Sequence, residues 1–162
     1  MASRDALSAE DWAFWDTWMQ AQRLLAKEVE RVLQRDYGIS KAEFSILTTL
    51  HATAGGSLRV TDLADSLDWE KGRVAHQLSR MERRGLLERI EAGAAGRRTG
   101  VALTRSGKEV ARRAIRGHGA NLRRLAFDRL APEQAEAIYT WSNDLIRRFG
   151  PASAGASGPD GG

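Results

Sequence analysis

The amino-acid sequence predicts a mostly α-helical protein with one small β-hairpin. Apolar residues recur at steps of three, four and seven along several stretches, a pattern typical of amphipathic helices. Ser40 and Thr104 stand where they can cap helices, and two short apolar strands flank a loop of small residues at 91–100. With 162 residues, the chain has the size of one domain or of one domain with long terminal appendages.

The first two predicted helices are separated by a glycine. The first helix runs from Trp12 to about Arg35 and ends near Gly38, which can adopt the left-handed conformation of a helix C-cap. Ser40 and Glu43 have the spacing of a capping box, so a second helix begins there. The apolar stripe of the first helix consists of Trp12, Trp15, Met19, Leu25, Val29 and either Val32 or Leu33.

Two shorter helices follow in the middle of the chain. One covers Val60–Leu67 and has its apolar residues on one face. Asp68 can cap a second one, which runs from about Glu70 to Arg84 and is ended by Gly85. Two helices this close together, joined by so short a turn, have the spacing of a helix-turn-helix.

The predicted hairpin and the last helices complete the chain. Strands are predicted at Leu86–Ile90 and Val101–Leu103. Thr104 caps a long helix whose middle is weakened by two glycines, and Pro132 lies in the first turn of a last helix. The remaining segments, 1–11 and 150–162, are predicted to be disordered, and the second of them is made almost entirely of Gly, Ala, Ser and Pro.

Positive charge is concentrated in the middle of the chain. The formal net charge is +4, from 25 Lys and Arg against 21 Asp and Glu. Residues 69–113 hold 12 basic and 5 acidic side chains, whereas residues 1–68 hold 7 and 11. A basic segment that follows an acidic one indicates a module that faces a polyanion.

Several classes of protein are excluded or disfavoured by the composition. The chain has no cysteine, which excludes disulfides, thiolate nucleophiles and Cys-ligated zinc. Its longest uncharged run, Phe44–Leu58, is too short and too polar to span a bilayer, so we expect a cytoplasmic protein. The three histidines lie far apart, and no phosphate loop or catalytic motif is present. We therefore expect no metal, no cofactor and no enzymatic activity.

The order helix, helix, helix, strand, loop, strand is that of a winged helix-turn-helix. Its second short helix can enter the major groove of DNA, and its hairpin loop, the wing, can reach the minor groove. On this interpretation Arg and Gln side chains read base edges, and Lys binds phosphate. The candidate DNA-binding residues are Lys71, Arg73, His76, Gln77 and Arg80 on the helix, and Arg97 and Arg98 in the loop.

Two other interpretations remain open for this basic region. A basic helix face is often only solvated surface, although the paired arginines of the adjacent loop make that reading less favourable. The winged helix can instead be a protein-interaction module whose basic face meets an acidic partner, without sequence-specific DNA binding.

Three stretches resemble the MarR family of bacterial transcription regulators. They are Val60-Thr61-Asp62-Leu63-Ala64, Met81-Glu82-Arg83-Arg84-Gly85-Leu86-Leu87-Glu88-Arg89 and Leu103-Thr104-Arg105-Ser106-Gly107-Lys108. The resemblance covers about residues 12–149. It implies an obligate homodimer that binds a pseudo-palindromic operator in double-stranded DNA, most often as a repressor that a small molecule releases.

The resemblance also assigns a role to one loop residue. Arg97 matches the wing arginine of the family, six residues before the leucine of the leucine-threonine pair. The family usually has an aspartate two residues before that arginine, and this chain has Ala95 there. The expected support for Arg97 is therefore missing.

The length of the first helix agrees with the dimer that the resemblance implies. About 24 residues at about 1.5 Å each give about 36 Å, longer than one small lobe needs for its own core. A single large monomeric helical domain is the alternative. We expect residues 12–36 and 104–149 to form a helical dimerisation region and residues 40–103 to form the winged helix-turn-helix lobe.

A ligand site is harder to locate. Tryptophans crowd the first helix, and one more lies between the two short helices, so the chain has aromatic side chains that can line a pocket for a small aromatic or anionic effector. The candidate ligand residues are Trp15, Trp18, Met19, His51 and Trp69. The competing interpretation is that these aromatic residues build a core or a dimer seam and that His51 is an ordinary, partly buried histidine.

Overall fold

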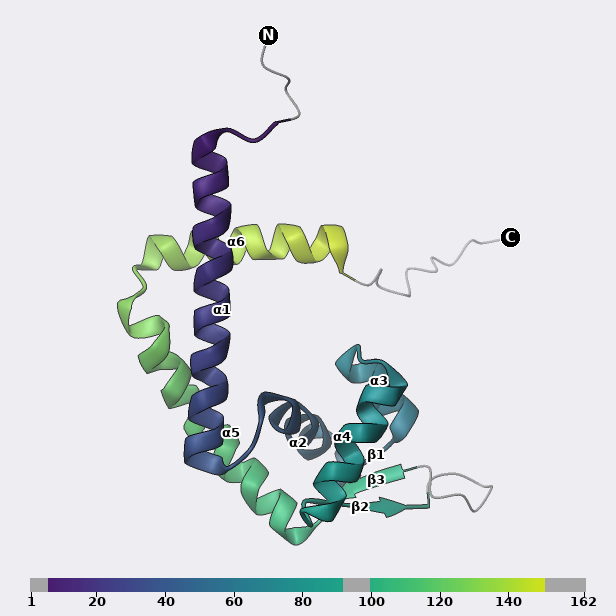
Figure 1. Ribbon diagram of the computed structural model, residues 1–162. Helices are drawn as coiled ribbons and strands as arrows, with labels where there is room; N and C mark the ends of the chain where they lie inside the picture. Colours follow the sequence, from purple (N-terminus) through teal and green to yellow (C-terminus); the bar gives the residue numbers. More distant parts are fainter. Residues whose placement is uncertain (1–5, 92–99, 151–162) are drawn as a thin grey trace, which may run out of the picture. The chain divides into compact units, whose positions relative to one another are not determined.

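The computed structural model describes residues 6–91 and 100–150, which divide into a unit that ends at Ala126 and a second unit that begins at Phe127. The first unit is mostly helical and contains one small antiparallel sheet (Figure 1), as predicted from the sequence. Its elements are α1 (Ala9–Tyr37), α2 (Lys41–Ala52), η1 (Ala54–Gly56), β1 (Ser57–Arg59), α3 (Val60–Leu67), α4 (Lys71–Arg83), β2 (Leu87–Ile90), β3 (Gly100–Leu103) and α5 (Arg105–Leu125).

The second unit contains a short 3-10 turn, η2 (Phe127–Arg129), and α6 (Pro132–Phe149). Pro132 occupies the first turn of α6, as predicted. No helix among the described residues is long and apolar enough to cross a membrane. The predicted disorder of 151–162 concerns residues outside the described ranges.

α1 begins three residues earlier than its apolar stripe predicts. Ser8 is the N-cap: its hydroxyl accepts a hydrogen bond from the Asp11 N–H at 3.1 Å, and the Asp11 carboxylate accepts one from the Ser8 N–H at 3.0 Å. The hydrogen bonds from Ser8 also hold the pKa of Asp11 below its usual value. The prediction of disorder through residue 11 is therefore wrong for 9–11, because this capping box precedes the first apolar residue of the stripe.

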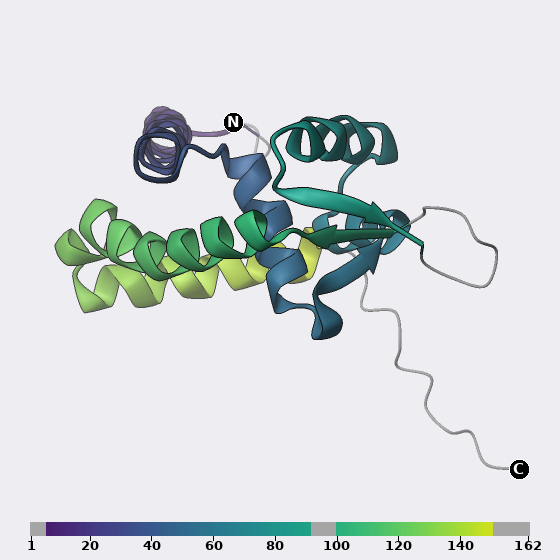
Figure 2. The same cartoon turned by 90° about the horizontal axis from the view of Figure 1, so that it is seen from below.

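The sheet has one strand more than the predicted hairpin. Its strand order is β1-β3-β2, and both pairings are antiparallel. Leu58 of β1 pairs with Val101, and Leu87 of β2 pairs with Leu103 (Figure 2 shows the strands side by side). β1 has only three residues and leads directly into α3, so it is too short to show an alternating pattern in the sequence.

The turn between α3 and α4 also differs from the prediction. Asp68 does not cap α4: it is the C-cap of α3 and adopts the left-handed conformation, with φ of 51°. Its N–H donates to the Asp65 carbonyl at 3.2 Å, and the Trp69 N–H donates to the Ala64 carbonyl at 3.0 Å. α4 then follows Glu70, whose side chain makes no capping hydrogen bond. Aspartate is favoured at an N-cap and also tolerates the left-handed conformation, so the residue type alone did not exclude a C-cap.

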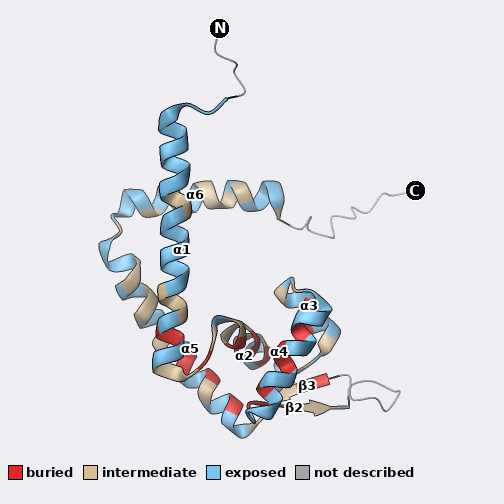
Figure 3. Cartoon of the chain, in the orientation of Figure 1, coloured by how far each residue is buried: buried red, intermediate tan, exposed pale blue. Residues whose placement is uncertain are grey.

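The core lies in the lobe formed by α2, α3, α4 and the sheet, together with the end of α1 and the first half of α5 (Figure 3). Leu47, Leu63, Leu78 and Met81 are completely buried there. The other half of α1 is mostly exposed although it is rich in large apolar side chains, and α6 has the same property. These exposed side chains are Leu7, Trp12, Phe14, Trp15, Leu24 and Leu25 before and on α1, and Ile138, Tyr139, Ile146 and Phe149 on α6.

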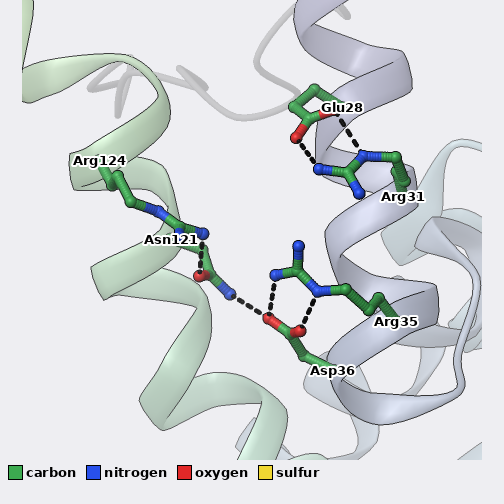
Figure 4. A network of polar contacts seen from close by, with 6 residues as sticks. All are labelled: Glu28, Arg31, Arg35, Asp36, Asn121 and Arg124. Carbon is green, nitrogen blue, oxygen red and sulfur yellow. Dashed lines mark hydrogen bonds and ion pairs between the residues drawn. The ribbon is translucent and has the colours of Figure 1, made fainter.

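A polar network joins α1 to α5 outside that core (Figure 4). Asp36 at the end of α1 accepts hydrogen bonds from Arg35 at 2.6 Å and from Asn121 of α5 at 3.4 Å. Arg124 in turn donates to the Asn121 side-chain oxygen at 3.1 Å. The hydrogen bond from Arg35 holds the pKa of Asp36 below its usual value. The network therefore fixes the second half of α5 against α1.

An ion pair between a buried carboxylate and a half-exposed arginine joins three helix ends. The Glu43 side chain is only 3% exposed and accepts hydrogen bonds from the Ser40 N–H at 2.8 Å and from Arg84, the C-cap of α4. Arg84 also donates to the carbonyl of Gly38 at 2.7 Å. One guanidinium thus connects the end of α1, the start of α2 and the end of α4.

Arg84→Ala should destabilise the protein by about 2–3 kcal/mol, because it leaves a buried carboxylate without its cation. Arg35→Ala is the matched control: Arg35 is about as exposed as Arg84 (48% against 45%), but its partner is a surface carboxylate. We expect the control to cost less than about 1 kcal/mol. Denaturant unfolding at one protein concentration measures both, and equal losses would contradict the role given to Arg84.

The start of α5 approaches the turn after α4 very closely. The Thr104 hydroxyl accepts from the Gly107 N–H at 3.0 Å and donates to the Gly85 carbonyl at 2.6 Å. Gly107 is buried against Leu86, and a Cβ at position 107 would lie far inside contact distance of the Leu86 carbonyl oxygen. This close approach requires glycine at 107.

Gly107→Ala should therefore cost about 2–4 kcal/mol, because the methyl group meets backbone that cannot rotate away. Gly119→Ala on the same helix is the control, since a Cβ there meets no atom within 4 Å. Alanine at 119 should be neutral or stabilising by about 0.5–1 kcal/mol, because it has the better helix propensity. A Gly107→Ala protein as stable as the original would show that α5 does not pack this closely.

Candidate nucleic-acid interface

α4 presents a basic face because its opposite face is fixed in the core. Val74, Leu78 and Met81 are fully buried and recur at steps of four and three. The side chains on the other side of the helix are exposed. They include four of the predicted DNA-binding residues, Lys71, Arg73, His76 and Arg80, together with Arg83.

Gln77 does not belong to this exposed face. Its exposed fraction is 9%, and it lies on the side of α4 that carries Val74 and Leu78. The prediction that Gln77 reads a base edge is therefore wrong in this structure. Gln77 follows Val74 by three residues and precedes Met81 by four, so it lies on the buried stripe and not beside the exposed arc.

Arg73 rests on an aromatic ring. Its guanidinium carbon lies 4.1 Å from the centroid of the Trp69 ring, a cation–π contact. Trp69 is half-buried and packs against the core of the lobe. The two residues together line two cavities of about 440 Å³ each, one along the α3–α4 turn and one that also includes Glu30 and Lys41.

The two predicted wing residues, Arg97 and Arg98, lie outside the described residues. The strands that lead to and from that segment are described, and they pair from Leu87 with Leu103 to Ile90 with Gly100. On β2, the Arg89 guanidinium lies 3.6 Å from the Glu82 carboxylate of α4. This ion pair connects the base of the hairpin to the basic helix.

The predicted ligand residues do not come together. His51 lines one cavity and Trp69 lines two others, and none of the three is lined by Trp15, Trp18 or Met19. Trp15 and Trp18 instead contact each other on α1, with ring centroids 5.3 Å apart. The five candidate ligand residues are therefore spread over different places in the described structure, and their binding of a ligand stays a prediction.

The cavity beside His51 contains two cations that the sequence did not single out. Lys108 and Arg112 of α5 line it together with His51 of α2, above the apolar side chains of Leu50 and Leu103. Its volume is about 350 Å³, and none of its lining residues is acidic. The spacing of 108 and 112 places both on one face of a helix, but only the fold brings that face to residue 51.

A metal site is not found in the part of the chain that the structure describes: no group of three or more His, Asp or Glu side chains is placed to hold an ion there. Of the acidic residues closest in sequence to the start of α4, Asp65 lies in α3, whereas Asp68 and Glu70 lie in the α3–α4 turn. They line one cavity together with Lys71 and Arg73.

Both the sequence and the structure of this chain are similar to those of known proteins. The model of the MarR family matches residues 37–98. The structure is similar to that of Sco3205, a MarR family transcriptional regulator from Streptomyces coelicolor in complex with DNA, with a TM-score of 0.82 and 30% identity over 95% of this chain and 96% of that chain. No curated protein matches the sequence.

Two further solved structures share the architecture. AbsC, a MarR family transcriptional regulator from Streptomyces coelicolor, is 30% identical over 88% of this chain and 98% of that chain, with a TM-score of 0.73. MepR of Staphylococcus aureus, solved with DNA, is 18% identical over 83% of this chain and 96% of its own, with a TM-score of 0.70, and shows the shared fold. The resemblance seen in the three sequence stretches is thus confirmed, and the chain belongs to the MarR family of transcriptional regulators.

Proposed function

We propose that this protein is a homodimeric, cytoplasmic transcription regulator that binds a pseudo-palindromic operator in double-stranded DNA. Its proposed role there is that of a repressor. The observation that carries this proposal is the exposed basic face of α4, which the buried face of the same helix holds in place. A helix of this kind fits the major groove. The DNA complex of the 30% identical Sco3205 supports the same function, and the named relatives are regulators rather than enzymes.

Each side chain of this face has a proposed role. Arg73, His76 and Arg80 contact base edges in the major groove, and Lys71 binds a phosphate. Arg97 and Arg98 reach the minor groove, where the negative potential attracts guanidinium groups. Gln77 has no part in base reading, because its side chain is buried.

We propose that a second copy of the chain packs against the exposed apolar residues of α1 and α6. Trp12, Trp15 and Leu25 on α1 are each more than 40% exposed, as are Ile138 and Phe149 on α6. Apolar surface of this extent marks an interaction site. A two-fold dimer presents two recognition helices about 34–36 Å apart, which matches half-sites one turn of DNA apart.

The experiment starts from an operator selected from random duplexes. Arg73→Ala should lower the preference for one base pair in each half-site by about 5- to 150-fold, because one bidentate contact is lost. Lys71→Ala removes the same charge from the same helix. It should weaken binding to all sequences alike and reduce the slope of log affinity against log salt by about 0.9.

Two outcomes would overturn this proposal. Failure to bind any duplex at low salt would favour the alternative of a protein-interaction module whose basic face meets an acidic partner. If the protein selects duplexes but sediments as a monomer, the proposed dimer and the proposed paired half-sites are both wrong.

We further propose that a small aromatic or anionic effector releases the DNA by binding the cavity of His51, Lys108 and Arg112. Two permanent cations attract a carboxylate there, and Leu50 and Leu103 offer apolar contact to a ring. The cavity volume of about 350 Å³ lies in the range of small-molecule sites.

Benzoate and its ring-substituted relatives are suitable probes for this cavity. A probe that binds the folded protein should raise its melting temperature and dissociate the DNA complex. In Lys108→Ala the affinity should fall about 5- to 30-fold, the loss expected for one charge-assisted contact. Lys27→Ala, which removes an exposed lysine of α1, is the control. If both variants respond as the original protein does, the effector site lies elsewhere.

A further inference from the structure

We propose that Trp69 is a positioning residue that determines how selectively Arg73 reads DNA. Its indole ring holds the Arg73 guanidinium in a fixed place before DNA arrives. The inference rests on the proposed function of Arg73 as a reader of a base edge. It replaces the sequence-based interpretation of Trp69 as a ligand residue.

The ring is itself held by the fold. The Trp69 side chain packs against the core of the lobe, and the backbone N–H of Trp69 donates to the Ala64 carbonyl of α3 at 3.0 Å. Asp68 immediately before it adopts the left-handed conformation, which turns the chain between α3 and α4. Both backbone features place the indole at the start of α4, four residues before Arg73.

The contact between Arg73 and Trp69 is a cation–π contact, and the ring offers the guanidinium no oxygen acceptor. The guanidinium carbon lies 4.1 Å from the ring centroid, well within the distance at which a cation and an aromatic face attract each other. A guanidinium carries five N–H donors, and an aromatic ring has no carboxylate or carbonyl oxygen to bind them. Arg73 therefore keeps donors for the O6 and N7 atoms of guanine.

The acidic neighbours of Arg73 do not take up those donors. Asp65 of α3 and Asp68 and Glu70 of the following turn line one cavity with Arg73. Within residues 6–91 and 100–150, however, the Arg73 guanidinium makes no ion pair and no hydrogen bond. A carboxylate partner would occupy the same N–H groups that a guanine needs. An aromatic partner orders the side chain without that competition.

Preorganisation by Trp69 has a specific consequence. A free arginine loses much rotamer freedom when it binds a base edge, and a side chain already held in place loses less. The advantage applies to the base that Arg73 reads and to no other position of the operator. Trp69 should thus contribute to selectivity at one base pair per half-site, and we infer that this base pair contains guanine.

The test separates this role from simple core packing. Trp69→Leu keeps an apolar side chain but has no aromatic face, and Trp69→Phe keeps a smaller aromatic face. We expect Trp69→Leu to reduce the preference at the base pair identified by Arg73→Ala by about 2- to 30-fold, the range of a cation–π contact. Trp69→Phe should keep most of the preference at that base pair. In both variants the preferences at the other base pairs and the salt dependence of binding should stay unchanged.

A double variant provides the decisive comparison. If Trp69 acts through Arg73, Trp69→Leu should have no further effect on base preference in an Arg73→Ala background. Equal losses at every operator position, or an undiminished effect in the Arg73→Ala background, would show that Trp69 serves packing alone and would overturn the inference. Full base preference in Trp69→Leu would do the same.

Failure of the inference is distinguishable from failure of the proposed function. If Arg73→Ala changes no base preference at all, Arg73 is not a reader and the proposed function of this residue fails. If Arg73→Ala changes the base preference and Trp69→Leu does not, only the inference about Trp69 fails. Should Trp69→Leu not fold, as judged by circular dichroism and melting, Trp69→Met and Trp69→Phe make the same comparison between a side chain without and one with a ring face.

Discussion

The position of the basic helix depends on one ion pair, between Arg84 and the buried carboxylate of Glu43. Glu43 is also the third residue of α2 and completes its capping box. The same carboxylate therefore accepts hydrogen bonds from the Ser40 N–H and from the Arg84 guanidinium. Arg84 follows the last residue of α4 and also holds the Gly38 carbonyl at the end of α1. A shift of any of these helix ends would separate the buried Glu43 carboxylate from its partner, and a buried charge without its partner is costly.

The same region explains why three short sequence stretches were enough to indicate the family. Arg84, Gly85 and Leu86 belong to one stretch, whereas Thr104 and Gly107 belong to another, and in the fold they touch: Thr104 binds the Gly85 carbonyl, and Gly107 makes room for Leu86. These residues are recognisable because a close approach and a buried charge leave few alternatives. Exposed positions of α4 have no such constraint, and there sequence can vary with the DNA that is read.

The features predicted correctly from the sequence were local ones. Helix caps, the apolar stripe of α4 and the paired strands each depend on residues a few positions apart, so Ser40 with Glu43 was sufficient to place the start of α2. Features that depend on distant segments were missed or wrong. Gln77 is polar but faces the core, and the cavity of His51 and Lys108 forms where α2 and α5 pack together. Asp68 is the exception among the local features, because it caps the end of α3 and not the start of α4.

α5 carries both the proposed effector site and the contact to α1, and this arrangement constrains any mechanism of release. Lys108 and Arg112 lie in its first two turns, whereas Asn121 binds Asp36 of α1 near its other end. A continuous helix moves as one body, so a ligand that displaces the first turns of α5 also strains the hydrogen bonds to α1. Gly107 makes the first turn unable to move without breaking its contact with Leu86, which adjoins the end of α4. The start of α5 is thus tied to the end of α4 through Gly107 and Leu86, and the far end of the same helix is tied to α1 through the side chains of Asn121 and Asp36.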